Sequence, residues 1–142
     1  MRHRFATALL IAASAFYTHT ATAAEIEFVS HLTAAQEVPS VQGAGKGALN
    51  ATLDTSTSQL RWKISYSGLS GPVTAGHFHG PASKTESAGV AIGFKGNMSS
   101  PITGEATLTP VQMGELFDGK WYVNLHTAQN PKGEIRGQVM AK

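Results

Sequence analysis

The chain has 142 residues and no cysteine, and its eleven Lys and Arg residues stand against nine Asp and Glu residues. This length suits one domain with one hydrophobic core, and the absence of cysteine excludes disulfide bonds and a lipid anchor on a leader cysteine. Two of the basic residues lie in the first four positions, so the remainder is close to neutral and has no basic cluster that would follow phosphates. Nucleic acid is therefore excluded as an expected partner.

The first 23 residues have the pattern of a secretory signal peptide. Two arginines begin the segment, residues 5–16 form a mostly apolar run, and small residues follow. The apolar run is too short to span a bilayer, and no later segment approaches that length. The small residues predict cleavage after Ala23, or after Ala24 as a second choice. We therefore expect one mature domain over residues 24–142, in the periplasm or outside the cell.

Apolar and polar residues alternate with a period of two through most of the remaining chain. In the clearest run, Leu60, Trp62, Ile64 and Tyr66 alternate with charged or small polar residues. Eight such runs, separated by clusters of Gly, Pro, Ser, Asn and Asp, predict an all-β antiparallel sandwich of immunoglobulin-like or superoxide-dismutase-like type. The runs cover residues 25–32, 46–54, 59–69, 73–80, 89–94, 102–109, 120–126 and 134–140.

One short helix is expected between Thr109 and Gly119. Thr109 can act as the N-cap, Pro110 suits the first helical position, and Gln112 completes a capping box. Gly119 can supply the left-handed exit. We expect this helix to cover one end of the sandwich.

The last two strands form a predicted hairpin around a loop at Pro131–Gly133, in which Gly133 is free to take a positive φ. That loop sets His126 opposite Gln138. The apolar residues of both strands then share the core face, and the polar residues share the other face. The polar face is predicted to carry Tyr122, Asn124, His126, Glu134, Arg136 and Gln138.

His77 and His79 lie two positions apart on a predicted strand, so their Cβ atoms share one face about 6.5–7 Å apart. Imidazoles at this spacing can bind one ion, with His126 as a third ligand and Glu134 or Asn124 orienting a ring. Such a site suits copper or zinc, and copper is favoured because imidazoles bind Cu²⁺ more tightly than Zn²⁺. The alternative is a structural network in which the histidines bond carbonyl and carboxylate groups and lock the strands together.

Three stretches, "AAQEVPSV", "YSGLSGPVTAGHFHGPA" and "WYVNLHTAQNPKGEIRGQV", are similar in sequence and order to the CHRD domain family, which is named after chordin and is widespread in secreted bacterial proteins. The similarity covers about residues 25–139. The family usually has "HIHG" where this chain has "HFHG", so Phe78 is a departure that keeps both histidines. The resemblance implies a secreted binding module, and it adds Glu37 to the polar set that the alternation selects.

Enzymatic function is not expected. The chain lacks a GxSxG nucleophile elbow and a Gly-rich phosphate loop. A copper enzyme similar to copper-zinc superoxide dismutase is a second alternative, since that sandwich also uses a His-x-His strand. It is disfavoured because only His31, an expected incidental surface residue, could supply a fourth imidazole. The expected partner is a metal ion or an unidentified extracellular protein.

Overall fold

The structure is a computed structural model that describes residues 24–142, so the signal peptide predicted for residues 1–23 lies outside the described residues. Nine strands form one antiparallel sheet in the order β5-β4-β7-β8-β1-β2-β3-β6, and β9 pairs with β1. This confirms the predicted all-β class. The elements are β1 (Glu25–Thr33), η1 (Ala34–Gln36), β2 (Lys46–Asp54), β3 (Gln59–Ser67), β4 (Val73–His79), β5 (Val90–Gly93), β6 (Ile102–Thr107), α1 (Pro110–Phe117), β7 (Tyr122–Thr127), β8 (Ile135–Gln138) and β9 (Met140–Ala141).

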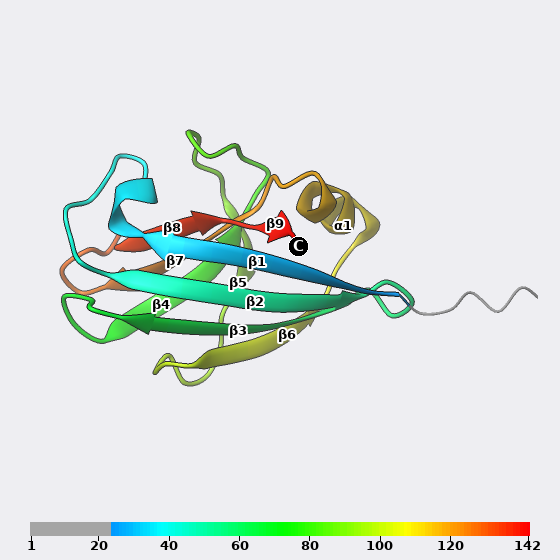
Figure 1. Cartoon of the computed structure of the whole chain (residues 1–142), viewed down its shortest axis with the longest axis horizontal. Coiled ribbons are helices and arrows are strands. Elements are labelled where there is room, and N and C mark those ends of the chain that lie inside the picture. Colours follow the sequence, from blue (N-terminus) through cyan, green and yellow to red (C-terminus); the bar gives the residue numbers. More distant parts are fainter. Residues whose placement is uncertain (1–23) are drawn as a thin grey trace, which may run out of the picture.

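The sheet folds into two layers that face each other across the core (Figure 1). Strands β1, β2, β3 and β6 form one layer, and strands β4, β5, β7 and β8 form the other. The ladder between β1 and β8 contains one residue pair, Thr33 and Arg136, so the two layers are joined over a short length. The arrangement is the predicted antiparallel sandwich.

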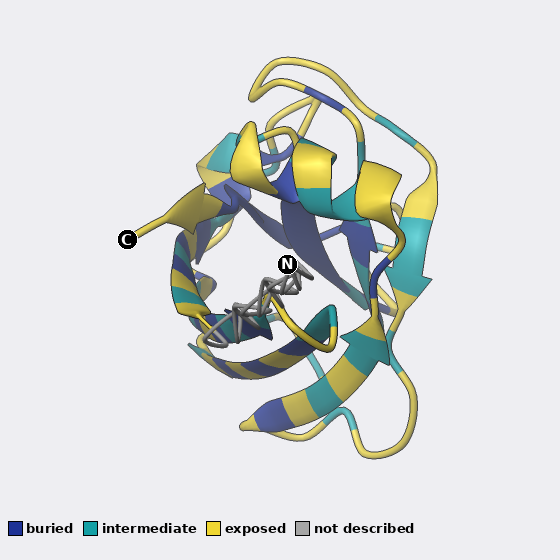
Figure 2. Cartoon of the chain, turned by 90° about the vertical axis from the view of Figure 1, so that its right-hand side faces the viewer, coloured by how far each residue is buried: buried dark blue, intermediate teal, exposed yellow. Residues whose placement is uncertain are grey.

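Residues along β1, β2 and β3 alternate between buried and more exposed positions, as the dark blue and yellow bands in Figure 2 show, whereas β8 and nearly all of β7 are buried on both faces. Phe78 of β4 is fully buried, and its ring centroid lies 5.2 Å from that of Trp62 and 5.8 Å from that of Trp121. Burial of a Phe side chain stabilises a fold by about 1.5–3 kcal/mol. Because His77 and His79 flank Phe78 in an extended strand, its burial turns both imidazoles to the opposite face.

The predicted helix is α1, and its capping box is present. The Thr109 hydroxyl accepts a hydrogen bond from the backbone N–H of Gln112 at 3.2 Å, and the Gln112 side chain accepts one from the Thr109 backbone at 2.9 Å. Gly119 has the expected positive φ, at 66°. The helix buries Leu116 and lies at one end of the sandwich (Figure 1). No helix within residues 24–142 has the length and apolar character needed to cross a membrane.

The pairing predicted for the last hairpin was wrong by four residues. Tyr122, not His126, lies opposite Gln138. The turn spans residues 128–134 and is longer than the predicted loop, although Gly133 does take a positive φ, at 129°. Because side chains on a strand alternate with a period of two, an even shift changes the partners but leaves each residue of the strands on its predicted face.

Candidate metal centre

Strands β4 and β7 bring the three candidate histidines to one surface. His77 pairs with Asn124 and His79 pairs with Tyr122 in the antiparallel ladder. On one face of such a ladder, residues on a diagonal are also within reach of each other. His77 therefore lies beside His126, and His79 lies beside Asn124.

The three imidazole rings converge. Nδ1 of His77 lies 3.0 Å from Nε2 of His126, and their ring centroids are 4.9 Å apart. The ring centroid of His79 lies 5.4 Å from that of His77. One nitrogen from each ring can be chosen so that all three lie within 4.8 Å of one another. The rings are half-buried, and nitrogens at this spacing could hold one metal ion.

Backbone carbonyl groups fix two of the rings. Nδ1 of His126 donates to the carbonyl oxygen of Pro131 at 3.0 Å, and Nδ1 of His79 donates to the carbonyl oxygen of Ala88 at 3.0 Å. A neutral imidazole that donates from Nδ1 carries its lone pair on Nε2. Nε2 of His126 then faces His77, and Nε2 of His79 faces Oδ1 of Asn124 at 3.1 Å.

The cluster favours neutral imidazoles. Burial lowers the pKa of His77, and the nearby rings of His126 and His79 lower it further. Burial also lowers the pKa of His126, against the opposing effect of its bond to Pro131, and His79 adds to the decrease. Both side chains are therefore uncharged near neutral pH, which is the form that binds metal ions.

Glu37 approaches the same polar surface from the other layer. It follows η1, is 8 % exposed, and lies beside Asn124 and Arg136. Burial raises the pKa of Glu37 to about 7, although the charge of Arg136 and the amide of Asn124 oppose this increase. Gly133 makes room for it, because a Cβ there would lie 2.5 Å from Oε1 of Glu37 and 2.7 Å from Nδ2 of Asn124. The alternation of the strands could not select Glu37, since it lies outside them.

Tyr122 stands between one histidine and a cation. Its ring is parallel to that of His79, with centroids 4.8 Å apart and 3° between the planes, and Cζ of Arg136 lies 3.5 Å from the Tyr122 ring centroid. The Tyr122 hydroxyl donates to the carbonyl oxygen of Ala88 at 3.3 Å. This carbonyl also accepts a hydrogen bond from His79. The stacked rings of Tyr122 and His79 are therefore both bonded to the loop that contains Ala88.

Arg136 and Gln138 fasten the loop at residues 81–89 to β8. Nη2 of Arg136 donates to the carbonyl oxygens of Ser83 at 3.0 Å and Glu86 at 2.7 Å. The side-chain amide of Gln138 donates to two further carbonyl oxygens, those of Ala82 and Gly119, each at 2.8 Å. Part of the predicted polar set thus holds irregular backbone whose carbonyl groups would otherwise lose hydrogen bonds.

A family model of the CHRD domain matches residues 28–139. The chain belongs to the CHRD domain family. The match includes the three histidines and every polar residue of the predicted set, and it confirms the resemblance found in the sequence. No curated protein and no solved structure matches the chain.

Glu134 of this CHRD domain points to a different partner from the one predicted. Its carboxylate accepts hydrogen bonds from the backbone and hydroxyl of Ser70, at 2.7 and 2.6 Å, and from the hydroxyl of Thr127 at 2.5 Å. Burial alone would raise the pKa of Glu134, but these bonds outweigh it and lower the pKa. Within the described residues Glu134 makes no hydrogen bond to a histidine, whereas Oδ1 of Asn124 lies 3.1 Å from Nε2 of His79. His31 is exposed on β1, as expected.

Proposed function

We propose that this CHRD domain is a non-enzymatic binding module that takes up one transition-metal ion, with copper preferred over zinc. His77, His79 and His126 are the proposed ligands. The observation that carries this proposal is the convergence of the three imidazoles, whose nitrogens lie within 4.8 Å of one another although the residues come from two strands. We place the module in the periplasm or outside the cell, after removal of residues 1–23, on the pattern of the sequence.

The preference for copper rests on ligand chemistry, because imidazole nitrogens bind Cu²⁺ more tightly than Zn²⁺. In the described structure Nδ1 of His77 and Nε2 of His126 share a hydrogen bond of 3.0 Å. When the ion binds Nδ1 of His77, this bond is broken and the proton on that nitrogen moves to Nε2.

The bonds to Pro131 and Ala88 also support the proposal. They hold His126 and His79 through Nδ1 and leave Nε2 of each ring for an ion. Imidazole ligands in metal sites are commonly held in this way, since a carbonyl group on the second nitrogen fixes both the tautomer and the direction of the ring. Oδ1 of Asn124 must then move away from Nε2 of His79.

The test is a calorimetric titration of metal-free protein with Cu²⁺ and, separately, with Zn²⁺. We expect one equivalent of Cu²⁺ to bind saturably and more tightly than Zn²⁺, and the triple variant His77→Ala, His79→Ala, His126→Ala to lose this binding. His31→Ala is the matched control, because it removes an exposed imidazole elsewhere. Saturable binding that the triple variant retains, or no saturable binding at all, would exclude the proposal.

The same hydrogen bonds favour a second candidate function, in which the histidines only hold loops to the sheet. Loss of such a bond from a buried partner costs about 1–3 kcal/mol. The variant His126→Asn separates the two functions, because its side-chain nitrogen stands near the position of Nδ1 and can still donate to Pro131, whereas Nε2 is absent. The metal proposal predicts that this variant keeps the bond to Pro131 but no longer gains thermal stability from Cu²⁺. A gain equal to that of the wild type would favour the purely structural function.

A further inference from the structure

Asn124 lies between the three histidines. It pairs directly with His77 in the ladder between β4 and β7, and His126 follows it by two positions, on the same face of β7. Directly opposed residues of such a ladder have Cβ atoms about 4.5–5.5 Å apart. Oδ1 of Asn124 also lies 3.1 Å from Nε2 of His79. Each of the three proposed ligands is therefore a neighbour of this one side chain.

The contact between Asn124 and His79 brings two acceptors together. Nδ1 of His79 donates to the carbonyl oxygen of Ala88, so a ring that bears one proton has a lone pair on Nε2. An amide oxygen also offers only lone pairs. Asn124 is 4 % exposed, and its Oδ1 has no other hydrogen-bond partner within residues 24–142. Two buried lone pairs that face each other are unfavourable unless a proton or a metal ion lies between them.

Glu37 lies on the other side of the same amide. Nδ2 of Asn124 and the Glu37 carboxyl group approach Gly133 so closely that a Cβ there would lie 2.7 Å from Nδ2 and 2.5 Å from Oε1. A nitrogen in this position stabilises the ionised form of Glu37. Beside an ionised Glu37, a reversed amide would set an oxygen against a carboxylate. Ionised Glu37 therefore directs Oδ1 of Asn124 toward the histidines.

We infer, on the basis of the function proposed above, that Asn124 is a fourth ligand of the metal centre and binds the ion through Oδ1. Asn124 thus contacts the ion itself, whereas the sequence predicted only that it orients a ring. An ion that enters at Nε2 of His79 displaces Oδ1 by rotation of the amide, and the displaced oxygen turns toward the ion. Three imidazole nitrogens and one amide oxygen make a mixed nitrogen and oxygen set, which suits tetragonal Cu²⁺.

The test compares the Cu²⁺ affinities of Asn124→Leu, Asn124→Asp and the wild type by calorimetric titration of metal-free protein. Leu is similar to Asn in size and has no ligand atom, so Asn124→Leu should bind Cu²⁺ at least about tenfold more weakly. Asp keeps the oxygen, so Asn124→Asp should bind at least as tightly as the wild type does. A reversed amide that donates to Nε2 of His79 would instead compete with the ion, and its removal would tighten binding. Equal or tighter binding by Asn124→Leu overturns the inference.

Electron paramagnetic resonance of the bound Cu²⁺ distinguishes a ligand from a residue that acts through its neighbours. Asn124→Asp replaces a neutral oxygen with an anionic one, so the copper signal should shift to lower g∥. An unchanged signal overturns the inference whatever the affinity. If the far-ultraviolet circular dichroism spectrum shows that Asn124→Leu does not fold, the signal of Asn124→Asp decides.

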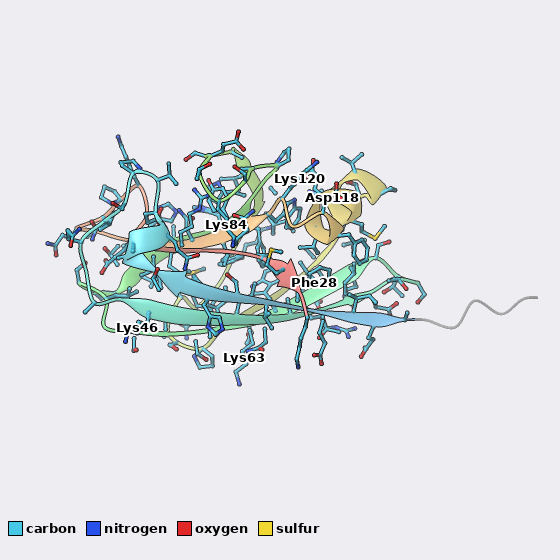
Figure 3. The ribbon with its side chains drawn as sticks, turned by 45° about the horizontal axis from the view of Figure 1, so that its top comes forward. Phe28, Lys46, Lys63, Lys84, Asp118 and Lys120 are labelled. Atoms are coloured by element: carbon cyan, nitrogen blue, oxygen red, sulfur yellow. The ribbon has the colours of Figure 1, made fainter. Side chains whose placement is uncertain are left out.

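Asn50 supplies the matched controls. It is exposed on β2 and pairs with Lys63 of β3, so the two side chains share one face. Figure 3 shows Lys63 on the opposite side of the β1 and β2 ribbons from Lys84, which belongs to the loop that Arg136 fastens to β8. Asn50→Leu and Asn50→Asp should therefore bind Cu²⁺ as the wild type does.

Failure of the fourth ligand can be told apart from failure of the metal centre. Wild-type affinity in Asn124→Leu, together with loss of binding in the triple histidine variant, would overturn the role of Asn124 alone. No saturable binding of Cu²⁺ by the wild type would overturn both.

Discussion

The buried carboxyl group of Glu37 should make the stability of the domain depend on pH in a predictable direction. Burial raises its pKa from 4.5 to about 7. Below pH 4.5 the group is protonated in both the folded and the unfolded chain. Between pH 4.5 and 7 the unfolded chain loses the proton and the folded chain retains it, so the free energy of unfolding falls as the pH rises. Above pH 7 both forms are ionised and the loss is constant.

The size of this effect follows from the shift. Each pKa unit corresponds to 1.36 kcal/mol, so Glu37 should lower the free energy of unfolding by about 3 kcal/mol between pH 4.5 and pH 8. Glu37→Gln has no titrating proton at this position. The difference between wild type and variant, measured by urea denaturation at several pH values, therefore isolates the contribution of this one group from those of the histidines.

The expected result is that the variant becomes more stable relative to the wild type as the pH rises, by about 3 kcal/mol in total. Glu105→Gln, on the exposed face of β6, is the control for a general effect of removing a negative charge. If the difference between wild type and Glu37→Gln were the same at pH 4.5 and pH 8, the carboxyl group would not be buried as described, and the reasoning would fail.

Three further outcomes are expected. Copper should stay bound below pH 6.5, where an ordinary histidine is protonated, because the pKa values of two proposed ligands are lowered; release centred at or above pH 6.5 in a pH titration would contradict this. Gly133→Ala should lower the free energy of unfolding by about 2 kcal/mol or more, since its φ is positive and its Cβ would meet a buried carboxyl oxygen. Gly71→Ala, which meets nothing within 4 Å, is the control, and equal effects in urea denaturation would refute the steric reasoning. Arg136→Lys should speed tryptic cleavage after Lys84, because the two hydrogen bonds from Arg136 to carbonyl oxygens of this loop are lost. The digestion rate is measured by mass spectrometry, and an unchanged rate would show that these bonds do not hold the loop in place.

Strand periodicity was sufficient to place the histidines on one surface. The alternation of apolar residues selects the face that Phe78 occupies, and the opposite face then receives His77 and His79 without any knowledge of the pairing partner. The predicted pairing for His126 was wrong by four residues, but the error was even and left its face unchanged. What periodicity cannot provide is the distance between strands, which depends on the ladder between β4 and β7.

Periodicity failed where the backbone is irregular. Glu37 lies after a short 3₁₀ helix, and only the family motif identified it. Glu134 directly precedes β8, where the alternation of the strand no longer fixes the direction of a side chain, and it therefore reaches Ser70 and Thr127 and not a histidine. The carbonyl partners in residues 81–89 could not be predicted from periodicity either, because this loop is positioned by side chains from distant strands.

The structural and metal-binding functions of the histidines use different atoms of the same rings. In His126 and His79 the bond to a loop carbonyl uses Nδ1, and the proposed coordination uses Nε2. The loop bonds therefore do not compete with an ion; they restrict the rings and so reduce the entropy that binding must overcome. A polar surface that holds two loops in place therefore already gathers the three rings. The proposed ion would further require the rotation of Asn124, the transfer of one proton within His77, and a closer approach of the ligand nitrogens from 4.8 Å to about 4.2 Å or less.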